Sequence, residues 1–92
     1  MNFKFFEDAN LGVFATKILL KGRPVRYVYH NLDGDWQFHT AANPKEEDAC
    51  VLSLAEVVRL DSLINGLFDL PLGWMSSRKS KDSEWSYSKH KE

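Results

Sequence analysis

The dipeptide Asp33-Gly34 is the feature of this sequence that most limits its fold. It separates two segments rich in β-branched and aromatic residues, 25–30 (VRYVYH) and 35–40 (DWQFHT). An Asp-Gly pair readily adopts the positive φ angles of a tight turn. The two segments are therefore predicted to be paired strands of a β-hairpin.

The register of this hairpin has two interpretations. A two-residue type I′ turn places the apolar side chains of both strands on one face, namely Val25, Tyr27, Tyr29, Trp36 and Phe38. A type I turn followed by a left-handed glycine shifts the pairing by one residue, so that Trp36 and Phe38 oppose His30 and Val28. We favour the first register because it separates apolar from polar side chains better.

Further strands are expected on both sides of the hairpin. Residues 11–20 (LGVFATKILL) form the first, with a short strand at 3–6 before it. Residues 51–52 are predicted to form a short edge strand. Segments 74–78 and 84–87 are aromatic enough to form a closing hairpin.

Two short helices are predicted in the second half of the chain. Ser53 and Glu56 have the spacing of a capping box, so a helix should begin there. The apolar positions on either side of Leu60 form two stripes that are rotated relative to each other, and Asp61 is a good N-cap for a second helix. Pro71 should end that helix.

Together these elements predict the fold class and the domain organisation. A chain of 92 residues is expected to form one domain. We predict a single compact α+β domain over 1–87, with an antiparallel sheet of about four to six strands and two short helices on one face; residues 88–92 should be a frayed tail. The expected core consists of Tyr27, Tyr29, Trp36, Phe38, Val57, Ile64, Leu67 and Phe68.

Charge and targeting signals narrow the classes of partner and compartment. The net charge of −1 gives no general attraction to nucleic acid or to anionic membranes. Residues 31–70 nevertheless carry eight acidic and two basic residues, so this acidic centre could draw a basic partner. The single cysteine, and the absence of a signal-peptide pattern or a long apolar run, favour a cytoplasmic protein without a membrane partner.

Two histidines and the cysteine are the candidates for chemistry. His30 and His39 share a face in the favoured register, and Cys50 lies further along the chain. Their spacing matches none of the usual zinc motifs, and a cysteine beside Val51 and Leu52 is more typical of a buried thiol. We therefore expect no catalytic residues, no metal and no cofactor. The alternative is a small-molecule-binding or hydrolytic protein that uses His30 and His39.

The C-terminal part supplies the predicted contact surface. Tryptophan and arginine are typical of the residues that dominate protein–protein interfaces, and Trp74, Arg78 and Trp85 occur together here. We call these three the C-terminal cluster and predict that it binds a protein partner. Basic and aromatic residues in this region could also bind single-stranded nucleic acid weakly, but the acidic centre makes nucleic acid an unlikely partner.

The order of several short motifs resembles a family of small bacterial proteins of unknown function, some of whose members are described as immunity-protein-like in polymorphic toxin systems. The motifs are Gly22-Arg23-Pro24-Val25, Tyr27-Val28-Tyr29, Asp33-Gly34-Asp35-Trp36-Gln37-Phe38, Val51 with Ser53-Leu54, Asp69-Leu70-Pro71, Gly73-Trp74 and Arg78. The resemblance covers about residues 12–78. It implies a compact α+β domain without established catalysis, and its immunity-like members imply that the chain binds and blocks a toxin protein.

Overall fold

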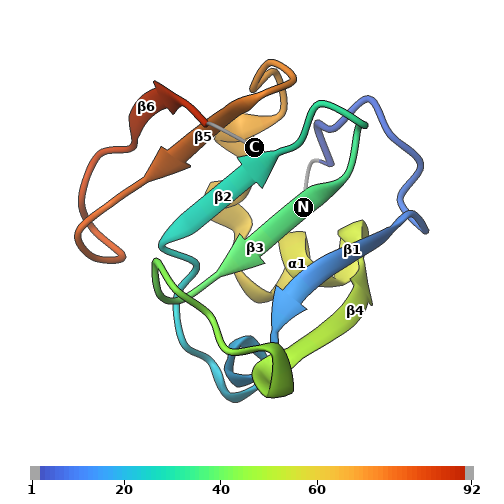
Figure 1. The fold of residues 1–92 in the computed structure, drawn as a ribbon. Coiled ribbons are helices and arrows are strands. Elements are labelled where there is room, and N and C mark those ends of the chain that lie inside the picture. The colour runs from blue at the N-terminus through green and yellow to red at the C-terminus, as the bar shows by residue number, and fades with distance from the viewer. Residues whose placement is uncertain (1–2, 91–92) are drawn as a thin grey trace.

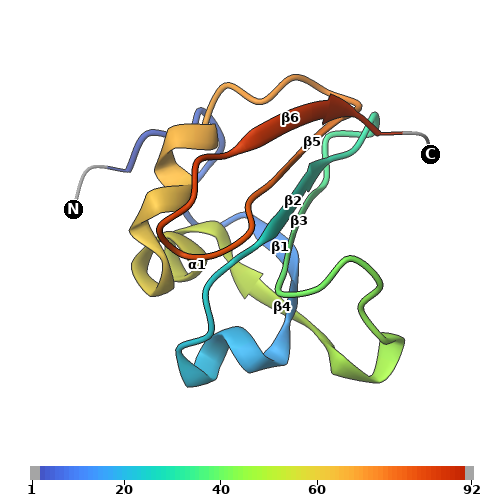
Figure 2. The same cartoon turned by 90° about the vertical axis from the view of Figure 1, so that its left-hand side faces the viewer.

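A six-stranded sheet forms the centre of the protein in a computed structural model, which describes residues 3–90 (Figures 1 and 2). The strands lie in the order β4-β1-β3-β2-β5-β6. Their bounds are β1 Gly12–Thr16, β2 Tyr27–His30, β3 Trp36–His39, β4 Ala49–Ser53, β5 Trp74–Ser77 and β6 Ser86–Lys89. Together with short helices over Leu54–Leu60 and Ser62–Leu67, these strands confirm an α+β fold.

The sheet is mixed, so the prediction of a purely antiparallel sheet is wrong. β1 and β3 run parallel, with Phe14 beside Gln37, whereas the other neighbouring strands run antiparallel. The reason is the way the β2–β3 hairpin joins the sheet. It pairs with β1 through its second strand, which runs in the same direction as β1.

The hairpin adopts the register that we did not favour. Gly34 has a φ of 96°, its amide donates to the carbonyl of Asn31 over 2.9 Å, and the amide of Asn31 donates to Asp35 over 2.8 Å. His30 consequently pairs with Trp36. A turn with one left-handed glycine adds a residue on one strand, which shifts the pairing by one position.

Two short helices, α1 (Leu54–Leu60) and η3 (Ser62–Leu67), lie on the same face of the sheet, as predicted (Figure 2). The hydroxyl of Ser53 accepts from the amide of Glu56 at the start of α1, and the carboxylate of Asp61 accepts from the amide of Leu63. The second helix is a 3₁₀ helix, which differs from an α-helix by its tighter turn.

Two further 3₁₀ turns, η1 (Lys17–Lys21) and η2 (Glu46–Asp48), lie in the loops. The first replaces the end of the strand predicted over 11–20, because only Leu19 of its residues turns into the core and Gly22, with a φ of 90°, ends it. Residues 3–6 form no strand. Across residues 3–90, no helix has the length and apolar character needed to span a membrane.

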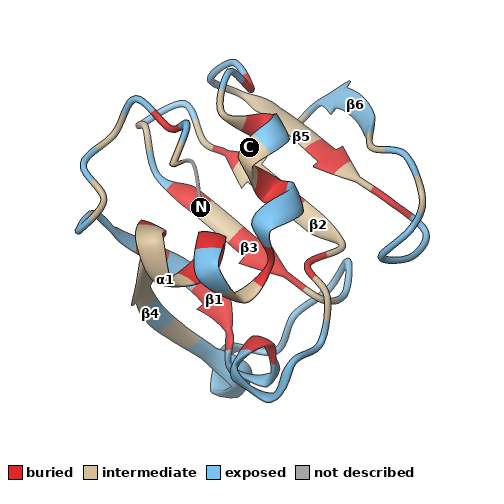
Figure 3. Ribbon diagram, turned by 180° about the vertical axis from the view of Figure 1, so that it is seen from behind, coloured by how far each residue is buried: buried red, intermediate tan, exposed pale blue. Residues whose placement is uncertain are grey.

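The core lies between the sheet and the helices (Figure 3). Five of the predicted core residues are fully buried: Trp36, Phe38, Val57, Ile64 and Leu67. Phe68 packs against them but is partly exposed. Tyr27 and Tyr29 lie on the other face of the sheet, and Val28 occupies the core in their place, because of the one-residue shift in register.

The C-terminal strand extends beyond its predicted end. β6 pairs with β5 as far as Lys89, and the amide of His90 donates to the carbonyl of Gly73 over 2.7 Å. Ser88 and Lys89 therefore belong to the sheet, and His90 is hydrogen-bonded to it, where the sequence predicted a frayed tail. Residues 91 and 92 of that tail lie outside the described residues.

Candidate functional site

Arg78 of the C-terminal cluster is a buried structural residue and offers little to a partner. Its side chain forms an ion pair with Asp61, and both groups are almost completely buried. Its Nε donates to the carbonyl of Val25 over 2.8 Å and its Nη1 donates to that of Lys81 over 3.1 Å. The guanidinium carbon lies 4.4 Å from the centre of the Trp85 ring. These contacts join β5 to the junction between α1 and η3.

The two tryptophans of the C-terminal cluster are partly buried. Both pack against the core, and Trp74 pairs with His30 on the side of the sheet that faces the helices. Trp85 covers the guanidinium of Arg78. The structure therefore brings Arg78 and Trp85 into contact, but it uses them to close the core.

His30 and His39 lie on opposite faces of the sheet, so the prediction that they share a face is wrong. His30 faces the helices, and its ring stacks on Trp36 with ring centres 3.9 Å apart. Its Nδ1 lies 2.6 Å from the carbonyl oxygen of Leu70, which can only accept, so the ring N–H donates a hydrogen bond there. Its Nε2 lies 3.7 Å from the carboxylate of Glu7. This histidine is held by the core.

His39 lies on the face of the sheet that the helices leave uncovered, and it too is almost fully buried. Its Nδ1 is 2.8 Å from the hydroxyl of Thr16, and its Nε2 is 2.9 Å from the side-chain oxygen of Gln37. Burial lowers the pKa of His39. A neutral ring with its proton on Nε2 satisfies both contacts, since it donates to Gln37 and accepts from Thr16.

The described residues contain no group of three or more histidine, cysteine or acidic side chains placed to hold a metal ion. Cys50 is partly buried in β4, where it pairs with Ala15 of β1. The sequence predicted a buried thiol, whereas Cys50 is only partly buried where it packs against the core.

A row of mainly apolar side chains crosses the uncovered face, which we call the open face. Five successive strand partners form this row: Val51, Phe14, Gln37, Tyr29 and Met75. Figure 1 looks onto this face of the sheet. Val51 is 65% exposed and Phe14 is 45% exposed. Burial raises the pKa of Tyr29, and the neighbouring Tyr27 raises it further, so the hydroxyl stays neutral.

Sequence reasoning missed the open-face row because the favoured register placed the tyrosines in the core. The competing register contained the necessary signal. It left both tyrosines on the face opposite Trp36 and Phe38.

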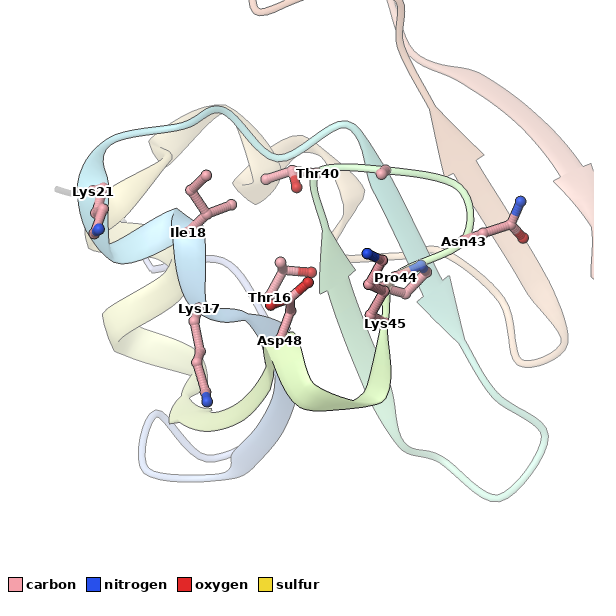
Figure 4. A pocket seen from close by; sticks show the side chains of 10 residues that line it. Thr16, Lys17, Ile18, Lys21, Thr40, Asn43, Pro44, Lys45 and Asp48 are labelled. Carbon is pink, nitrogen blue, oxygen red and sulfur yellow. The ribbon is translucent and has the colours of Figure 1, made fainter.

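A groove of about 570 Å³ opens beside this face, between η1 and the loop over residues 40–48 (Figure 4). Ile18 and Lys21 line one wall, whereas Pro44 and Lys45 line the other. The Nζ of Lys17 donates to the backbone carbonyl of Glu47 over 3.0 Å and joins the two walls. The volume falls within the range of small-molecule pockets.

No family model matches the chain, and neither a curated protein nor a solved structure matches it. The resemblance to the immunity-like family of small bacterial proteins therefore stays a prediction.

Proposed function

We propose that this chain is a non-enzymatic protein-binding module and that its contact surface is the open-face row. The observation that carries the proposal is the adjacent pair Val51 and Phe14, which project from neighbouring strands with 65% and 45% of their surfaces exposed. Apolar side chains that gather on one face of a small protein are typical of an interaction site.

The composition of the row supports a protein partner. Tyr29 and Met75 continue the apolar surface across the sheet, and tyrosine and methionine are enriched in protein interfaces. The C-terminal cluster supports such a role less well, because Arg78 is buried and ion-paired. The same burial weakens the nucleic-acid alternative. The family resemblance adds the expectation that the partner is a toxin.

The proposal is tested with the proteins whose genes flank the gene for this chain. Each is purified and titrated against the chain by calorimetry. Phe14→Ser and Tyr29→Ser should each weaken the binding of a partner by at least about tenfold, since central aromatic contacts dominate binding energy. Leu63→Ser is the matched control, because Leu63 is 51% exposed but belongs to η3 on the helical face. A complex that is weakened by Leu63→Ser but not by Phe14→Ser would overturn the proposal.

A second candidate function is small-molecule binding or hydrolysis in the groove. The observation in its favour is that Thr16 lines the groove while its hydroxyl contacts His39, which Gln37 holds from the other side. A hydroxyl beside an oriented imidazole is the geometry of an activated nucleophile.

This second function predicts measurable hydrolysis of an activated ester such as p-nitrophenyl acetate. Thr16→Val and His39→Gln should each lower the rate by about tenfold or more, because each removes one member of the pair. His30→Gln is the control on the opposite face and should leave the rate unchanged. A rate in the wild type that does not exceed the buffer background excludes hydrolysis of this ester class.

A further inference from the structure

The edge strand β4 has a hydrogen-bonding side that no strand occupies. β4 ends the strand order, with β1 as its only neighbour among the described residues, and no other segment lies beyond it (Figures 1 and 3). We propose that β4 pairs with β4 of a second copy of this chain, antiparallel and centred on Val51. This inference goes beyond the proposed binding of a different protein, and it shares Val51 with the open-face row.

The backbone of β4 shows which groups are available. The amide of Leu54, just after β4, donates to the carbonyl of Leu11, just before β1, so these two residues extend the β1–β4 register as a hydrogen-bonded pair. Hydrogen-bonded and non-bonded residues alternate along an antiparallel strand. The amides and carbonyls of Ala49, Val51 and Ser53 therefore point away from β1, toward the free edge.

The β4 edge also lacks the features that normally prevent strand pairing. Its sequence, ACVLS, contains no charged residue and no proline, and Val51 is 65% exposed. Natural edge strands are usually protected by lysine, proline or a bulge. At the other edge of the sheet, β6 has the sequence SYSK and carries Lys89. The two edges therefore differ in their capacity to pair.

A second copy fits this edge because the pairing is self-complementary. Centring it on Val51 sets each Val51 against the other, Ala49 against Ser53, and Cys50 against Leu52 of the second copy. No charged residues oppose each other within these pairs, and a two-fold axis makes both sides identical. The axis also joins the two open-face rows, since Phe14 lies directly beside Val51 in each copy.

The dimer should be weak, because five residues on each side bury less surface than a standard protein interface. We expect a dissociation constant on the order of 10 to 100 µM. Sedimentation equilibrium of the full chain over this concentration range should show the average mass rise from monomer toward dimer. A monomer at all concentrations up to about 1 mM would overturn the proposal.

Substitutions at the two edges separate β4 pairing from other contacts. Val51→Lys places two like charges opposite each other and should weaken the dimer by at least about tenfold. It leaves the core intact, because Val51 projects into solvent. Tyr87→Lys is the matched control on β6, where Tyr87 is 54% exposed. Equal weakening by both variants, or weakening by Tyr87→Lys alone, contradicts pairing through β4.

The register is tested by disulfide formation between two different variants. In the proposed pairing, Cys50 lies opposite residue 52 of the second copy in a non-hydrogen-bonded pair, where Cα atoms are about 4.5 Å apart and a disulfide can form. Wild type mixed with Cys50→Ser/Leu52→Cys under mild oxidation should therefore give a covalent heterodimer. Wild type mixed with Cys50→Ser/Ser53→Cys should not, because residue 53 projects to the other face. Equal yields from the two mixtures would reject this register.

Discussion

Asp61 connects three parts of the chain through a single carboxylate. It pairs with Arg78, accepts from the amide of Val25 over 3.0 Å, and caps η3. Asp61→Asn keeps an oxygen acceptor but removes the charge, which leaves the buried guanidinium without a counterion. We expect the free energy of unfolding to fall by about 3 kcal/mol in urea titrations.

The control for this prediction is an exposed ion pair in α1. Arg59 pairs with Glu56 at the surface, with 62% of the arginine side chain exposed. Glu56→Gln should lower the free energy of unfolding by less than about 1 kcal/mol, because solvent screens exposed pairs. Equal losses in the two variants would contradict a special role for Asp61.

His39 should make stability depend on pH. Its pKa in the folded protein lies below the ordinary value of 6.5 because burial disfavours the imidazolium. The unfolded chain therefore binds the proton more readily, so stability decreases as pH falls from 6.5 toward the lowered value. Well above pH 6.5 the ring is neutral in both states and makes no such contribution.

Urea titrations of wild type and His39→Gln on both sides of pH 6.5 test this. The difference between the two proteins isolates His39, because the other titrating groups are common to both. Wild type should lose more stability than the variant on acidification. The same loss in both proteins would show that His39 does not govern this dependence.

At the scale of elements, Gly34 fixes the register of the β2–β3 hairpin. Its φ of 96° is a conformation that residues with a Cβ rarely adopt. Gly34→Ala should lower the free energy of unfolding by about 1 kcal/mol or more. Gly66 of η3 is the matched control, since its φ is not positive and an added Cβ meets no atom within 4 Å. Gly66→Ala should leave stability unchanged or raise it by up to about 1 kcal/mol.

The same hairpin shows why element positions were predictable but their register was not. Aromatic and β-branched composition placed both strands and the turn, and helix caps placed α1 and η3. Polarity then favoured tyrosines in the core and His30 outside it. The fold reverses this because stacking on Trp36 and a hydrogen bond to Leu70 satisfy a buried His30, while the tyrosines remain partly exposed. Both compensating contacts depend on tertiary structure, which local polarity does not encode.

At the scale of the whole molecule, the open face and the mixed sheet have a common origin. Docking the hairpin through β3 makes β1 and β3 parallel and brings Phe14 beside Gln37. The sequence contains no local signal for this choice, since both hairpin strands are apolar enough to dock. In the C-terminal cluster, Arg78 is buried for a related reason. Its residue type predicted a partner contact, but its buried partner Asp61 lies 17 positions earlier in the chain.

The strand order also predicts a hierarchy of local stability. β3 has a paired strand on each side and carries the fully buried Trp36 and Phe38, whereas all four residues of β6 are exposed and pair on one side only. Opening β6 therefore removes little buried apolar surface, while opening β3 requires the whole core to unfold. Hydrogen exchange measured by NMR should show paired β6 amides exchanging at least about a hundredfold faster than those of β3. Similar protection in the two strands would mean that the C-terminal strand unfolds only together with the core, with Trp85 and Arg78 providing the coupling.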